Sequence, residues 1–142
     1  TFEFISEIGM FDFTVDGLPF VSITPDDTRY GMGDTIVIDI AAETSAYAVT
    51  GDIYMLILDP NGVFWTPCGP GFSWTLGFDP FLPAFTLPAM LDIYYEGFWE
   101  LPVTFGSIPF GETGQYHLFA GIAEQGTLDP WSDININEIT VE

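Results

Sequence analysis

Residues 34–42 read DTIVIDIAA, and the alternation in this stretch decides the fold class. Successive side chains of an extended chain point to opposite faces, so Ile36, Ile38 and Ile40 share one face. The same period of two recurs in residues 115–123, QYHLFAGIA, and no window holds the spacing of a long amphipathic helix. We therefore predict an all-β protein, a single antiparallel sandwich domain over residues 1–142, with these isoleucines in its core.

The neighbouring segments predict how the strands connect. Residues 52–59, DIYMLILD, are apolar on both faces, which is typical of a central strand covered on its second side by a loop or by another chain. The Pro-Asn-Gly that follows favours a tight turn, and so a hairpin. Residues 66–88 carry five prolines among aromatic residues, so we expect a long connection over the sandwich, with short edge strands near residues 73–76 and 84–87.

The closing residues 134–141 break the alternation. Ile134 and Ile136 share one parity, whereas the two aliphatic residues that follow them have the other. A bulge at Asn137 and Glu138 would bring both pairs to the core, and we predict one there. Further strands are predicted over residues 1–8, 10–15, 18–24 and 96–105.

The charge of the chain limits its partners. Twenty-one acidic residues stand against one arginine, Arg29, and the formal net charge is -20 over 142 residues. Nucleic acid and anionic lipid need basic patches, so both are excluded as partners. No run of 18 uncharged apolar residues occurs, and we expect no membrane insertion. Because 48% of the residues are hydrophobic, the acidic surface must surround a packed body, and cations, sugars and proteins remain as partners.

One segment resembles a known family. Residues 111–118, GETGQYHL, are similar to the turn into a strand that forms the tyrosine corner of immunoglobulin-like sandwiches. Leu118 stands where antibody-type domains have a cysteine, so aliphatic packing replaces the disulfide. More broadly, residues 33–142 resemble immunoglobulin-like modules of bacterial and archaeal secreted or surface proteins. The resemblance implies an extracellular or cell-surface scaffold, spacer, adhesin or filament subunit; a chain that begins at Thr1 fits a mature secreted protein or a fragment.

No catalytic pattern is present in the sequence. His117 is the single histidine and is expected on the solvent face of its strand, and no G-x-S-x-G motif accompanies it. Cys68 is alone, which excludes an intrachain disulfide. We expect a protein without enzymatic activity.

Calcium is the cofactor that the acidic and amide residues favour, because it takes six to eight oxygen ligands. In the closing segment, residues with side-chain oxygens recur along one face of the predicted strand. A further carboxylate precedes them in the sequence. The candidate ligands are Asp129, Asp133, Asn135 and Asn137. None of them lies in an EF-hand loop, since Glu138 stands where that loop requires glycine, and diffuse binding of counterions is the alternative.

The four tryptophans allow three interpretations. They can anchor the core and loops, form a subunit interface, or stack on sugars as a glycan-binding platform. The residues concerned are Trp65, Trp74, Trp99 and Trp131.

The function predicted from these patterns is that of a secreted structural protein. We expect a subunit that assembles with copies of itself into an extracellular filament or surface layer, with residues 1–8 as an exchanged strand. The predicted assembly residues are Phe2, Phe4, Ile8, Tyr54, Leu56 and Leu58. A calcium-dependent carbohydrate-binding or adhesive module is the alternative. Assembly of such acidic subunits should strengthen with salt or divalent cations.

Overall fold

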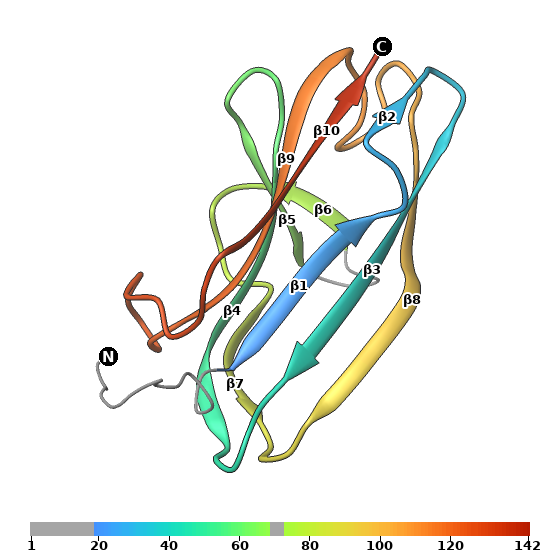
Figure 1. Cartoon of the computed structure of the whole chain (residues 1–142). Helices are drawn as coiled ribbons and strands as arrows, with labels where there is room; N and C mark the ends of the chain where they lie inside the picture. The colour runs from blue at the N-terminus through green and yellow to red at the C-terminus, as the bar shows by residue number, and fades with distance from the viewer. Residues whose placement is uncertain (1–18, 69–72) are drawn as a thin grey trace.

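The computed structural model describes residues 19–68 and 73–142, and every regular element within them is a β-strand (Figure 1). The strands predicted over residues 1–8 and 10–15 lie outside the described residues. The strands are β1 (Phe20–Pro25), β2 (Arg29–Tyr30), β3 (Thr35–Glu43), β4 (Val49–Leu58), β5 (Phe64–Cys68), β6 (Ser73–Leu76), β7 (Leu82–Leu87), β8 (Asp92–Pro102), β9 (Gly114–Ala123) and β10 (Asn135–Val141). The predicted all-β class is confirmed.

The described strands form two sheets. One is three-stranded, in the order β1-β3-β8, and the other has the order β2-β10-β9-β4-β5-β6, with β7 paired to β4. The short contact between β2 and β10 is parallel, and the other pairs are antiparallel. In Figure 1, β1, β3 and β8 run side by side as one layer, and β4 and β9 belong to the other.

The core lies between these layers. Ile36 and Ile38 of β3 are 0% exposed and Ile40 is 8% exposed, which confirms the predicted core face. From the opposite sheet, Ile57 and Leu118 are also 0% exposed. Full burial of one such side chain stabilises the fold by about 1.5–3 kcal/mol, so each of these isoleucines contributes substantially to it.

The middle of the chain connects as the sequence predicts. Leu58 pairs with Phe64 across the hairpin, where Gly62 has a φ of 81° that an L-residue would strain to adopt. The carboxylate of Asp59 accepts the backbone N–H of Val63 at 3.0 Å and so closes the turn. β6 and β7 form within the proline-rich connection, and β4 is central, with β9 on one side and β5 and β7 on the other.

Tyr116 forms the corner contact expected from residues 111–118. Its ring is 0% exposed, and its hydroxyl donates to the carbonyl of Glu112 at 2.8 Å and accepts the N–H of the same residue at 3.1 Å. Burial raises the pKa of the Tyr116 hydroxyl. The contact ties the turn before β9 to the strand that follows it.

The bulge predicted at Asn137 and Glu138 is wrong. β10 pairs with β9 in continuous register from Asn135 to Val141. One face of β10 therefore carries Asn135 and Asn137 together with the core residue Ile139, which is 1% exposed. Ile134 and Ile136 are 58% and 56% exposed instead. The amides take the inward positions because they have hydrogen-bond partners there, described below.

Candidate functional site

The outer face of the larger sheet carries a continuous group of apolar side chains. Leu56 of β4 is only 3% exposed although it points away from the core. Phe78, from the connection between β6 and β7, lies over it, with ring centroids 5.5 Å from Tyr54 and 5.0 Å from Phe64. Phe64 in turn lies 6.1 Å from Phe119 of β9. The second side of β4 is thus covered in part by a loop, while Tyr54 and Leu58 stay half-buried.

A hollow of about 280 Å³ lies on this face beside Leu56. Its rim is exposed: Phe78 is 47% exposed and Leu128 is 66% exposed. Ile136 of β10 and Ile134, just before that strand, also reach it. We call this surface the outer apolar face. It consists of Tyr54, Leu56, Phe64, Phe78, Phe119, Leu128, Ile134 and Ile136. Most of these residues were missed from the sequence, although Phe119 lies on the predicted solvent face of its strand and could have indicated the patch.

His117 and Arg29 each have an acidic partner. The imidazole of His117 lies 2.9 Å from the carboxylate of Glu138. Arg29, the single arginine of the chain, forms an ion pair with Glu142. These pairs leave the outer apolar face without a basic group in the described part of the chain that would recognise an anion.

The side chain of Asp52, on β4, joins that strand to two neighbouring segments of the chain. It is 7% exposed, and its two carboxylate oxygens accept the N–H of Ala84 at 2.8 Å and the N–H of Gly126 at 2.9 Å. These backbone hydrogen bonds lower the pKa of the Asp52 carboxyl group. One carboxylate thereby holds both β7 and the connection between β9 and β10.

Two amides close the sandwich on the side where β1 meets β10. The side chain of Asn135 accepts the N–H of Ile23 at 2.9 Å, and Asn137 donates its amide N–H to the carbonyl of Ile23 at 2.7 Å. Ile23 is 0% exposed, so these bonds satisfy backbone groups at a buried strand edge. We call this contact the closed seam.

The opposite side of the sandwich, between β7 and β8, is open. A groove of about 230 Å³ runs between the sheets there, and its lining is almost wholly apolar. Phe85 of β7 and Tyr95 of β8 stand at its rim, 41% and 49% exposed. We call this groove the open seam, and sequence reasoning missed it because it depends on the pairing of strands far apart in the chain.

The structure does not gather the predicted calcium ligands. The amides of Asn135 and Asn137 face β1, whereas Asp129 and Asp133 belong to the connection before β10. In residues 19–68 and 73–142, no group of three or more His, Cys, Asp or Glu is placed to hold a metal ion. The amides of Asn135 and Asn137 bond instead to the backbone of Ile23.

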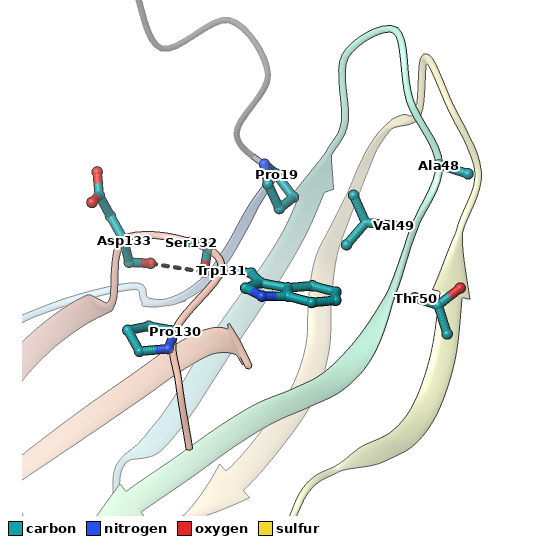
Figure 2. Close-up of a pocket in the computed structure, with 8 residues that line it drawn as sticks. All are labelled: Pro19, Ala48, Val49, Thr50, Pro130, Trp131, Ser132 and Asp133. Carbon is teal, nitrogen blue, oxygen red and sulfur yellow. Dashed lines mark hydrogen bonds between the residues drawn. The ribbon is translucent and has the colours of Figure 1, made fainter. Parts of the chain in front are cut away.

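The tryptophans do not form a shared platform. Trp99 is 8% exposed and lies 5.2 Å from the ring of Trp74, and Trp65 donates its indole N–H to Asp59 at 3.0 Å. Trp131 is the exception at 39% exposed, in a wide hollow at one end of the sandwich. Figure 2 shows its ring at the centre of that hollow, with Pro19 and Val49 beside it.

The predicted assembly residues divide into two groups. Tyr54, Leu56 and Leu58 lie on the outer side of β4, and the first two belong to the outer apolar face. Phe2, Phe4 and Ile8 lie outside the described residues. Within the described residues there is also no helix that could span a membrane.

Comparison with known proteins supports the fold alone. No protein-family profile and no curated protein matches the chain. Among solved structures, it is similar to the alkylpurine DNA glycosylase AlkC of Pseudomonas fluorescens, with a TM-score of 0.52 and 10% identity over 90% of this chain and 31% of that one. It is also similar to the sporulation control protein Spo0M of Bacillus subtilis, with a TM-score of 0.50 and 11% identity over 89% and 50%. The chain thus spans half or less of each.

Proposed function

We propose that this chain is a non-enzymatic structural subunit that associates with copies of itself through its outer apolar face, in an extracellular filament or surface layer. The observation that carries the proposal is the uncharged strip of exposed large apolar side chains on a chain of net charge -20. Contiguous apolar patches on soluble proteins mark interaction sites, and aromatic residues are enriched at protein interfaces.

The charge of the chain favours a second copy as the partner. A partner that binds mainly by charge would contact the acidic surroundings, whereas a second copy contributes a matching apolar strip. Copies of the chain repel one another through their acidic surfaces, and salt screens that repulsion. Association is therefore expected to strengthen as the ionic strength rises.

The alternative of a carbohydrate-binding module receives less support. Stacking on sugars needs exposed rings on one surface, and Trp65, Trp74 and Trp99 are buried or half-buried. The extracellular setting is part of the same proposal and comes from the resemblance of residues 33–142 to secreted modules; detection of the native protein in the culture medium or on the cell surface tests it.

Light scattering coupled to size exclusion tests the self-association. The molar mass is measured from about 0.01 M to about 1 M salt, a range over which the Debye length falls from about 30 Å to about 3 Å. We expect the mass of the wild-type chain to rise with salt. The double variant Ile134→Ser/Ile136→Ser should stay monomeric, because it removes two exposed residues of the outer apolar face.

Phe105→Ser is the matched control, since Phe105 is 78% exposed and lies outside that face. It should assemble like the wild type. Monomers at every ionic strength, or equal assembly of the double variant, would contradict the proposal.

A further inference from the structure

We propose that the open seam is the acceptor of an extended strand, and that its occupant is residues 1–8 of a second copy, which add to the edge of β8 at residues 92–95. This inference rests on the proposed self-association and names the segment that takes part in it. It is carried by the backbone of β8, by the shape of the groove and by the pattern of residues 1–8.

At Asp92 and Tyr94, the edge of β8 offers backbone groups that do not pair with β3. In the described part of the chain β8 pairs with β3 alone. Thr44 donates its N–H to the carbonyl of Leu91 at 2.9 Å, in the same register in which Ala41 pairs with Tyr94. Because hydrogen-bonded and non-hydrogen-bonded pairs alternate along an antiparallel ladder, the amides of Asp92 and Tyr94 point away from β3. An added strand would find its partners there.

The side chains of this part of β8 alternate in step with its backbone. Ile93 and Tyr95 line the open seam, whereas Tyr94 is 62% exposed on the other face. An incoming strand would therefore project every second residue into the groove between β7 and β8. The groove of about 230 Å³ has room for an aromatic ring, since a cavity of about 150 Å³ accommodates benzene.

The sequence of residues 1–8, TFEFISEI, fits such an edge. Phe2, Phe4 and Ile8 share one parity with Ser6, and Thr1, Glu3, Ile5 and Glu7 lie on the other. A strand of this kind has one apolar face and needs a surface to cover it. Side chains of equal parity are about 6.6–6.8 Å apart, so neighbouring phenylalanines would enter the groove in series.

A second copy, rather than the same chain, is placed to supply the segment. β1 and β8 are opposite edges of the three-stranded sheet. The chain enters β1 at Pro19, which is buried beside Trp131 and Val49 (Figure 2). A neighbouring copy can present residues 1–8 to β8 directly, without passing around its own sandwich.

Disulfide cross-linking between full-length chains tests the proposal. In a Cys68→Ser background, one chain carries Ser6→Cys, which keeps the apolar residues of the segment, and the other carries Tyr95→Cys at the groove rim. The two are mixed, oxidised mildly and separated without reductant. Because a bound segment holds the two thiols at a high effective concentration, we expect about tenfold more heterodimer than for a control pair.

The control pair combines Ser6→Cys with Tyr47→Cys, because Tyr47 is 75% exposed and more open to random collision. Adding Phe2→Ser/Phe4→Ser to the Ser6→Cys chain should lower the yield to that of the control. Equal yields from the two pairs would overturn the proposal. So would a dilute chain carrying both cysteines that closes a disulfide within itself and forms no dimer.

The two proposals fail in different ways. Equal cross-linking together with salt-dependent assembly that Ile134→Ser/Ile136→Ser abolishes would reject the open seam and keep the outer apolar face. Selective cross-linking, together with a molar mass that does not depend on the outer apolar face, would reject that face and keep the open seam.

Discussion

On its β1 side the sandwich is closed by two asparagine amides bonded to Ile23, whereas on its β8 side the sheets part around a hollow of about 230 Å³. Both sides end in a strand of the same three-stranded sheet. The closed seam satisfies the edge of β1 with side chains from β10, and the open seam leaves aromatic side chains half-exposed. One edge of this sheet is thus completed by side chains from within the molecule, whereas the other lies beside an apolar groove.

The largest effect is expected where the closed seam is broken. Asn135→Ala/Asn137→Ala removes both partners of the Ile23 backbone and leaves its N–H and carbonyl unpaired in a buried position. Each unsatisfied group costs about 1–3 kcal/mol, so the free energy of unfolding should fall by about 2–6 kcal/mol in urea denaturation.

Asn61→Ala is the control for that variant, because the amide of Asn61 bonds to Glu112 at an exposed site. Its effect should stay within about 0.5 kcal/mol. If the double variant were as stable as this control, the amides would not hold the seam.

A smaller effect, dependent on pH, is expected at Asp52, which holds the β7 wall of the open seam. Its pKa in the folded state lies below the ordinary value of 3.8, so its contribution to stability is present above that pH and is lost as the pH falls through the folded value. Asp52→Asn should be less stable than the wild type at neutral pH.

The difference between wild type and Asp52→Asn should shrink as the pH falls below about 3.8, because protonation removes the same charge from the wild type. Urea denaturation of both chains at a series of pH values measures it. A difference that stays constant down to the acid end would show that the charge of Asp52 contributes nothing.

The smallest effect on stability is expected at the rim of the open seam. Tyr95→Ser removes a ring that is 49% exposed and should change the free energy of unfolding by less than about 1 kcal/mol. A large loss of stability instead would mean that the rim belongs to the core.

Much of the fold could be predicted from local alternation. The face formed by Ile36, Ile38 and Ile40 is buried as expected, and the hairpin after Leu58 and the strands within the proline-rich connection form where predicted. These features depend on residues close together in the chain, whose parity and turn chemistry are visible in the sequence.

The closing strand could not be predicted in the same way. Burial of aliphatic residues favoured a bulge that would turn Ile134 inward, but the inward positions belong to amides whose partner, Ile23, lies 112 residues from Asn135. The outer apolar face and the open seam depend likewise on which strands become neighbours. The sequence likewise did not predict which tryptophans would pack together, as Trp74 and Trp99 do.

The order β1-β3-β8 also determines the symmetry of any assembly built on the β8 edge. If residues 1–8 of one copy add to the β8 edge of the next, as proposed above, the two surfaces in contact differ. Such a heterologous contact does not close on itself as a twofold dimer does, and each added subunit presents a fresh acceptor. Repetition of it gives a polar, open-ended polymer with two unlike tips.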